Sequence, residues 1–301
     1  MTGRAARFAG RAALVGLGAL AAQAALRAAR SAPGHDQLDR TNFHGRTVSL
    51  AGGPALAAAA TATAALGAGS SRVAVAAVLA GGGSGAVGFY DDIVGARPDQ
   101  KASKGFRGHV AALRAGKITS GMIKIVGVGA AAFGASVLVE ADSPGPRSRA
   151  GRAINIVLGT GVIAGTANLL NLLDLRPGRA LKAGGLLAAP LAAGGAAGLV
   201  AGPIGAAASL LPADLDEEIM LGDAGANSLG ALIGLSAVTR MGIGGRAALF
   251  AAIAALTATS EKVSFTKVIA ETPVLRELDA LGRRTDHVPD GSSTDRPRFL
   301  G

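Results

Sequence analysis

The stretch Gly88-Phe89-Tyr90-Asp91-Asp92-Ile93-Val94-Gly95 decides the fold, because it ends a long apolar run on two adjacent carboxylates. The run before it, from about Val73 to Tyr90, has the length and composition of a membrane-spanning helix. Two neighbouring aspartates in hydrocarbon would repel each other, and each would be costly to bury. They therefore need water, a cation or both, and the first hypothesis is a metal site at a membrane surface.

The composition predicts an all-α, polytopic membrane helix bundle. The chain has 301 residues, of which 50% are hydrophobic, and its mean hydropathy is +0.41. Its 46 glycines and 3% aromatic content indicate helices that approach each other closely, and such packing faces also permit a homodimer. The chain has no cysteine, which excludes disulfides and thiolate metal sites.

The net charge of +10 raises the question of a nucleic-acid partner. The Lys and Arg residues, however, gather between the apolar runs, and no aromatic platform for bases accompanies them. We therefore expect no nucleic-acid partner, and instead a positive-inside membrane protein that handles anionic substrates.

The apolar runs predict about nine spans, with the amino terminus outside and the carboxyl terminus inside. The basic segment 91–117 is expected to be cytoplasmic by the positive-inside rule. A signal peptide is the alternative reading of the first run. After a transmembrane domain at 1–262, residues 263–301 are expected to form a cytoplasmic amphipathic helix and a disordered tail. The predicted runs cover about 12–29, 48–66, 73–90, 118–139, 153–173, 183–201, 203–211, 222–238 and 247–259.

Four polar clusters fall at predicted cytoplasmic ends of these spans, so we expect them to converge on one cavity. They are 91–92, 101–117, 168–182 and 222–227. In the third cluster, Asn168, Asn171 and Asp174 lie within about 120° of one helix face, and Pro177 is expected to break the helix.

The residue types in these clusters predict metal-assisted phosphoryl transfer. Carboxylate and amide oxygens suit Mg²⁺ or Mn²⁺, and the basic groups suit a diphosphate. The oxygen donors are Asp91, Asp92, Asp174, Asp223, Asn168, Asn171 and Asn227, and the basic groups are Lys104, Arg176, Arg179 and Lys182.

Each cluster also has a purely structural interpretation. Paired carboxylates occur by chance at helix ends, Asn168 and Asn171 are candidates for interhelical hydrogen bonds, and basic loop residues enforce topology. The segment Gly222-Asp223-Ala224-Gly225 by itself is an ordinary turn into a helix.

Taken in order, the clusters resemble the polyprenyl-phosphate N-acetylhexosamine-1-phosphate transferase family, which includes phospho-N-acetylmuramoyl-pentapeptide transferase. The resemblance covers roughly residues 36–262. It rests on Gly88-Phe-Tyr-Asp91-Asp92, Lys104-Gly105-Phe106, Asn168-x-x-Asn171-x-x-Asp174 and Gly222-Asp223-Ala-Gly225.

The resemblance implies a ten-span, Mg²⁺-dependent enzyme of the plasma (inner) membrane with a cytoplasmic active site. Such an enzyme moves a sugar 1-phosphate from a UDP-sugar to a polyprenyl phosphate, releases UMP and serves cell-wall or glycan synthesis. By resemblance, Asp91 and Asp92 match the catalytic aspartate pair, Asp174 a metal-binding aspartate, Lys104 a phosphate-contacting lysine, and Asn171 and Asp223 the polar residues that line the nucleotide end. Together with the residue types above, this predicts Asp92, Asp174 and Asp223 as metal ligands. The predicted substrate contacts are Lys104, Asn168, Asn171, Arg176, Arg179, Lys182 and Asn227.

The chain departs from the family pattern in the second motif and in the last loop. Pro177 stands where members commonly carry a second aspartate, and nothing after Ser260 resembles the family's His-rich motif. A catalytically inactive polyprenyl-phosphate-binding or scaffold protein is therefore the alternative, and a cation or solute transporter is a third hypothesis. The paired aspartates, Asp174 and Asp223 favour the active enzyme.

Overall fold

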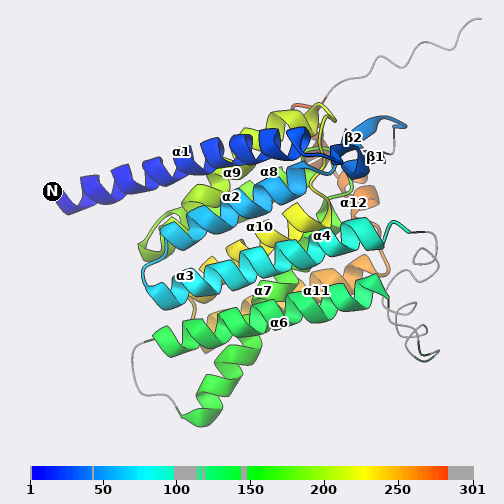
Figure 1. The fold of residues 1–301 in the computed structure, drawn as a ribbon. Coiled ribbons are helices and arrows are strands. Elements are labelled where there is room, and N and C mark those ends of the chain that lie inside the picture. The colour runs from blue at the N-terminus through cyan, green and yellow to red at the C-terminus, as the bar shows by residue number, and fades with distance from the viewer. Residues whose placement is uncertain are drawn as a thin grey trace, which may run out of the picture.

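A computed structural model describes residues 2–42, 44–97, 114, 116, 119–143 and 148–283. Within these ranges the chain forms a bundle of helices with one small β-hairpin, which confirms the predicted all-α class (Figure 1). The helices are α1 (Thr2–Ser31), α2 (Gly52–Leu66), α3 (Ser71–Ala77), α4 (Ser84–Val94), α6 (Ser120–Asp142), α7 (Arg149–Leu173), α8 (Arg179–Ala188), α9 (Gly198–Leu215), α10 (Gly222–Val238), α11 (Ile243–Ser260), α12 (Phe265–Glu271) and α13 (Pro273–Ala280).

Among the described residues, six helical segments are long and apolar enough to cross a membrane, and α2 is a shorter apolar helix. This supports a membrane-embedded bundle. The third predicted run is one continuous helix, because a π-helical segment at Val78–Gly83 joins α3 to α4. The six segments are Gly3–Ser31, Ser71–Val94, Ser120–Asp142, Arg149–Leu173, Gly195–Leu215 and Ile243–Ser260.

Helix α10 forms the centre of the bundle, and every residue from Ala224 to Val238 is buried. It packs against α7, α4 and α2 (Figure 1). The helices approach this closely because glycines lie at their contacts. A Cβ atom on Gly88 of α4 would lie 2.3 Å from the Asp223 carbonyl oxygen. On α10 itself, a Cβ atom at Gly230 would lie 2.5 Å from the Thr166 carbonyl oxygen of α7. Small residues thus bring α4, α7 and α10 to nearly backbone contact.

The first apolar segment is part of the bundle, because α1 packs along α9 and α2. A Cβ atom on Gly18 would lie 2.1 Å from the Gly202 carbonyl oxygen, so α1 and α9 also meet at glycines. After α1, the segment between the first two predicted apolar runs leads into the hairpin of β1 (Asp39–Thr41) and β2 (Thr47–Ser49). Strands of three residues carry too little periodicity to be recognised in the sequence.

The predicted spans at 183–201 and 203–211 are wrong in their boundaries. Helix α8 ends at Ala188, the chain turns through residues 189–197, and α9 covers Gly198–Leu215. The turn consists of small apolar residues without polar markers, and Gly194 adopts a left-handed φ of 86°. Arginines from elsewhere in the chain satisfy its carbonyls: Arg11 donates to Gly194 and Arg240 to Leu191.

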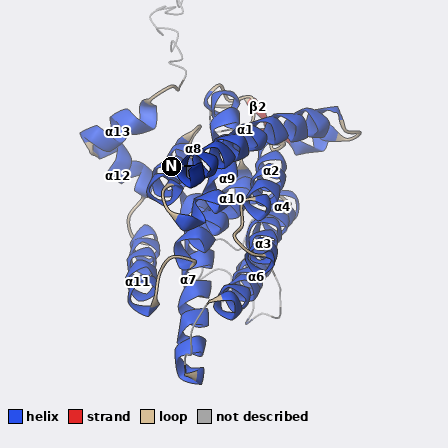
Figure 2. Ribbon diagram, turned by 90° about the vertical axis from the view of Figure 1, so that its left-hand side faces the viewer, coloured by secondary structure: helices blue, strands red, loops and turns tan. Residues whose placement is uncertain are grey.

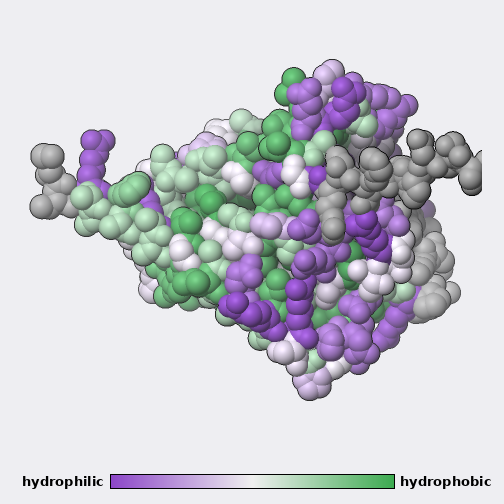
Figure 3. All heavy atoms as spheres, turned by 90° about the horizontal axis from the view of Figure 1, so that it is seen from above, coloured by the Kyte–Doolittle hydropathy of each residue, from purple (hydrophilic) through white to green (hydrophobic). Residues whose placement is uncertain are grey.

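Hydrophilic residues concentrate at one end of the bundle. Figure 3 shows apolar residues over much of the left-hand part of one face and hydrophilic residues gathered toward the right, where β1 and β2 lie in Figure 1. We call this the site end, because α4 ends there with Asp91 and Asp92 and α10 begins there with Asp223.

Candidate functional site

Asp92 joins the end of α4 to the beginning of α10. Its two carboxylate oxygens accept hydrogen bonds from the backbone N–H groups of Asp223 (2.9 Å) and Ala224 (3.0 Å). These N–H groups belong to the first turn of α10, where a helix leaves its donors without internal partners and where negative charge is favourable. Gly222 allows this entry, because it adopts a left-handed φ of 57°. Asp92 therefore caps α10 from a neighbouring helix.

Lys124 of α6 bridges the other two carboxylates of this junction. Its Nζ atom lies 2.8 Å from Asp91 Oδ2 and 2.5 Å from Asp223 Oδ2. The three side chains are largely buried, with exposed fractions of 23%, 13% and 19% for Lys124, Asp91 and Asp223. The hydroxyl of Ser120, at the start of α6, also hydrogen-bonds to Asp91. The aspartate pair thus receives cationic and N–H partners from the protein itself.

Asp174 connects the end of α7 to the same junction. It follows the last residue of α7 and accepts a hydrogen bond from the Gly222 backbone. Burial, together with the negative charges of Asp214, Asp92 and Asp223, raises its pKa well above the usual range. A cation bound among these carboxylates would relieve their mutual repulsion.

Asp214 holds the loop between α7 and α8. This aspartate is buried near the end of α9, and its Oδ2 atom accepts a 2.8 Å hydrogen bond from the Gly178 N–H. Gly178 has a left-handed φ of 71° and immediately precedes α8. The helix break predicted near Pro177 is confirmed, since α7 ends at Leu173 and α8 begins at Arg179.

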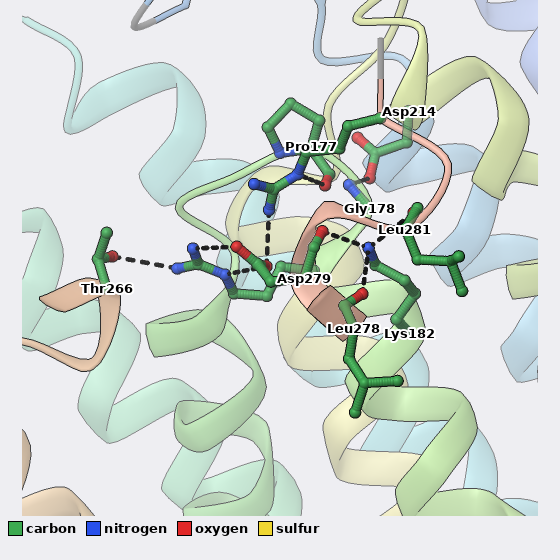
Figure 4. Close-up of polar contacts among 10 residues, drawn as sticks. Pro177, Gly178, Lys182, Asp214, Thr266, Leu278, Asp279 and Leu281 are labelled. Carbon is green, nitrogen blue, oxygen red and sulfur yellow. Dashed lines mark hydrogen bonds and ion pairs between the residues drawn. The ribbon is translucent and has the colours of Figure 1, made fainter. Parts of the chain in front are cut away.

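Two of the predicted diphosphate ligands contact α13 (Figure 4). Arg179 donates to both oxygens of Asp279 at 2.7 and 2.9 Å and to the Thr266 hydroxyl at 3.0 Å. Lys182 Nζ donates to the carbonyl oxygens of Leu278, Asp279 and Leu281 at 2.9, 2.6 and 3.1 Å. In the described conformation these cations therefore hold the carboxyl-terminal segment.

An open pocket of about 240 Å³ adjoins this loop. Three segments line it: the β-hairpin, the turn after α7 and the segment between α9 and α10. Glu217 is buried at its edge and binds the Asn42 amide and the His44 imidazole at 2.5 and 2.8 Å. The lining residues are Thr41, Asn42, Val48, Asp174, Leu175, Arg176, Pro177, Asp214, Glu217, Ile219 and Met220.

The amide residues predicted at the site have different environments. Asn168 is exposed and Asn171 is half-buried, and Asp174 directly follows the last residue of α7. Asn227 is buried, and its Nδ2 atom has no hydrogen-bond partner among the residues that the structure describes. Lys104 and most of the predicted cluster at 101–117 lie outside the described residues.

The structure thus brings together Asp91, Asp92, Asp174 and Asp223 and lines the adjoining pocket with Arg176. Among the described residues, no three acidic or histidine side chains form a group that could hold one metal ion. In this arrangement, Asp91 and Asp223 contact Lys124, and Asp92 contacts the α10 backbone.

Sequence reasoning missed Lys124, Asp214 and Glu217. Lys124 carried a usable signal, since a charged residue inside an apolar run marks a functional or paired position. Asp214 and Glu217 belong to an acidic stretch in which no local feature distinguishes buried from exposed members. No protein-family model, curated protein or solved structure matches this chain.

Proposed function

We propose that this protein is an integral-membrane transferase that moves a sugar 1-phosphate from a UDP-sugar to a polyprenyl phosphate and releases UMP. The observation that carries the proposal is the junction of Asp91, Asp92, Asp174 and Asp223 around the start of α10, next to a pocket. Isolated carboxylates in an apolar bundle would be expelled or paired, whereas a concentration of them suits a cation and a phosphate.

The proposal includes the membrane topology predicted from the sequence. The bundle would lie in the plasma membrane with about nine to ten crossings and with the site end facing the cytoplasm, where UDP-sugars are found. The basic segment 91–117 at this end supports that orientation through the positive-inside rule. A homodimer is compatible with the small-residue helix faces.

The proposed ligands of Mg²⁺ or Mn²⁺ are Asp92, Asp174 and Asp223, because all three offer carboxylate oxygens. In the described conformation they do not form one group around a single ion, so binding would require their side chains to move closer together. When bound, the ion would neutralise charge on the diphosphate. Asp174 supports this fit, since its neighbouring negative charges disfavour an ionised carboxylate without a cation nearby.

We assign the proton transfer and the orientation of the reacting groups to the chain's own residues. Both oxygens of Asp92 hold the α10 backbone, so Asp91 is the better candidate to accept a proton from the lipid phosphate. A lipid phosphate oxygen then attacks the phosphorus that carries the sugar, and the bond to UMP breaks. Lys124 lies beside Asp91, where it would keep that carboxylate oriented and offset charge on the phosphates.

The test is UMP release by purified protein with Mg²⁺, polyprenyl phosphate and a panel of UDP-sugars. We expect turnover with at least one sugar, and a loss of about 100-fold or more in Asp91→Asn. Asp92→Asn should also lose most activity. Asp36→Asn is the matched control, because Asp36 is exposed and precedes the hairpin. No UMP release from any sugar, or full activity in Asp92→Asn, would overturn the proposal.

The second candidate is a catalytically inactive polyprenyl-phosphate-binding or scaffold protein of the same fold. The contacts of Arg179 and Lys182 with α13 favour it, as does Pro177 in place of a second aspartate. Retained binding of polyprenyl phosphate without metal-dependent turnover would support this candidate over the enzyme.

A further inference from the structure

The segment from α12 to α13 has an apolar face that no part of the described chain covers. Within α13 and the residue after it, the exposed fractions are 67% for Val274, 42% for Leu275, 46% for Leu278 and 67% for Leu281. Val274, Leu278 and Leu281 recur at the spacing that aligns side chains along one side of a helix. Such large side chains, gathered on one short segment, mark an interaction surface.

The opposite side of α13 is fixed to the bundle. Asp279 binds Arg179 through two hydrogen bonds and also accepts one from Arg283 at 2.7 Å. Arg283 in turn donates to the Pro177 carbonyl at 3.0 Å, and Lys182 binds the last carbonyls of α13 (Figure 4). These contacts set the rotation of the helix, so its apolar side faces away from the loop at 177–182.

The position of the segment in the fold identifies what covers this face. Helix α11 is one of the six candidate membrane spans and is mostly exposed along its length, so in a bilayer it would present most of its surface to lipid. Only the residues 261–264 separate its end from α12, which keeps the segment at the level where that span leaves the membrane. Figure 2 shows α12 and α13 outside α8, on the same side of the bundle as α11.

We propose that the segment 265–281 is a membrane-surface strap, with the apolar face of α13 inserted into the interfacial region of the lipid bilayer. The polar face holds the loop at 177–182, and the apolar face lies against lipid. The attraction is hydrophobic, because residues 261–283 carry four basic and four acidic side chains despite the net charge of +10 for the whole chain.

The chain has no tryptophan, so one introduced residue reports its own environment in the full-length protein. Leu281→Trp and Val274→Trp place the indole on the apolar face. Ala280→Trp is the matched control, since Ala280 is also exposed and lies on the other side of α13. Each variant is reconstituted into phosphatidylcholine vesicles with or without acyl chains brominated near the headgroup.

We expect blue-shifted emission and strong bromine quenching for Leu281→Trp and Val274→Trp. For Ala280→Trp we expect red-shifted emission that acrylamide quenches and brominated lipid does not. Replacing part of the phosphatidylcholine with phosphatidylglycerol should leave all three spectra unchanged. The two apolar-face variants check each other if one of them is poorly folded.

Two results would overturn the proposal. Red-shifted emission with acrylamide quenching at positions 274 and 281 would show that the face lies in water. Blue-shifted emission without bromine quenching would show that protein covers it, as in a dimer. Neither result depends on transferase activity, so the strap and the proposed function are tested separately.

Discussion

The two ends of α10 are both capped by charged side chains from other helices, but they differ in charge balance. At its first turn, the carboxylate of Asp92 accepts hydrogen bonds from two backbone N–H groups. At its last turn, Arg246 of α11 donates to the Val238 carbonyl at 2.9 Å. Each charge has the sign that favours the helix dipole at that end.

At the Arg246 end of α10, one cation faces one anion, and both side chains are buried. Arg246 also donates to the carbonyls of Met241 and Asn155, at 3.0 Å each, and Glu140 lies 3.8 Å away. The Arg246 and Glu140 side chains are each only 3% exposed. One cation, one anion and several carbonyls form a buried structural contact between α6, α7, α10 and α11.

The Asp92 end has more carboxylates than cations. Lys124 contacts Asp91 and Asp223, while Asp174 adds a further carboxylate beside Asp92. A pocket adjoins this end. A buried network in which cations and anions are balanced, as at Arg246, serves the fold. A network with more carboxylates than cations beside an open pocket, as at Asp92, is suited to bind an additional ion or ligand.

The largest effect on stability is expected from Arg246→Met. The change leaves Glu140 and several carbonyls buried without their cation, so the free energy of unfolding should fall by about 3–5 kcal/mol. Thermal unfolding in detergent measures this. Arg152→Met, which alters an exposed arginine of α7, is the control, and a loss no larger than in the control would contradict the structural role of Arg246.

Lys124→Met should be the next most destabilising change, by about 2–3 kcal/mol, because its partners retain some solvent exposure. Unlike Arg246→Met, it should respond to Mg²⁺, because the carboxylates it leaves can bind the ion. Saturating Mg²⁺, at about 100 times its dissociation constant, should restore about 2.7 kcal/mol. If the unfolding temperature of Lys124→Met did not change with Mg²⁺, this would contradict the idea that the Asp92 end of α10, unlike the Arg246 end, can bind an ion.

Asp92→Asn should cost about 1 kcal/mol in stability, since the amide oxygen still accepts one hydrogen bond from α10 while the favourable charge is lost. The same variant should lose most UMP release. Thermal unfolding and turnover measured on one preparation separate the two effects. Equal proportional losses would indicate that Asp92 acts on activity only through folding.

The smallest effect concerns the contact between Asp279 and Arg179, which joins α13 to the bundle. Burial alone would raise the pKa of Asp279, but the hydrogen bond and charge of Arg179, with the charge of Arg283, outweigh it and lower the pKa. The docking energy is therefore present above the unfolded pKa of about 3.9 and is lost as pH falls through the folded value. Its size, discounted for solvent screening, is below about 1 kcal/mol.

Hydrogen exchange of the peptides covering residues 265–283 measures this docking. We expect faster exchange in acid below about pH 4, after correction for intrinsic rates. At neutral pH, these peptides in Asp279→Asn should exchange as fast as they do in the unaltered protein in acid. Lowering the pH should not make exchange in Asp279→Asn any faster. Exchange that stays slow in Asp279→Asn would show that other contacts hold the strap.

The sequence by itself determined that this is a helical membrane bundle, and it identified most of the carboxylates at the site end. The physical reason is that hydrocarbon tolerates long apolar helices but not unpaired charge, so Asp91, Asp92, Asp174 and Asp223 are conspicuous where they interrupt or end apolar runs. Pro177 marked the break before α8 for an equally local reason, since it disfavours helix at the residue before it.

Only the tertiary structure decided which groups meet. The partners of Lys124 lie far away along the chain, and a glycine contact between α4 and α10 brings them together. Arg179 and Asp279, which are 100 residues apart, meet because the strap folds back over the loop before α8. The turn at 189–197 was missed because its residues are as apolar as the helices on either side, although Pro190 and the Gly194-Gly195 pair are local turn signals. Pairing of this kind depends on helix packing distances, which no local pattern in the sequence specifies.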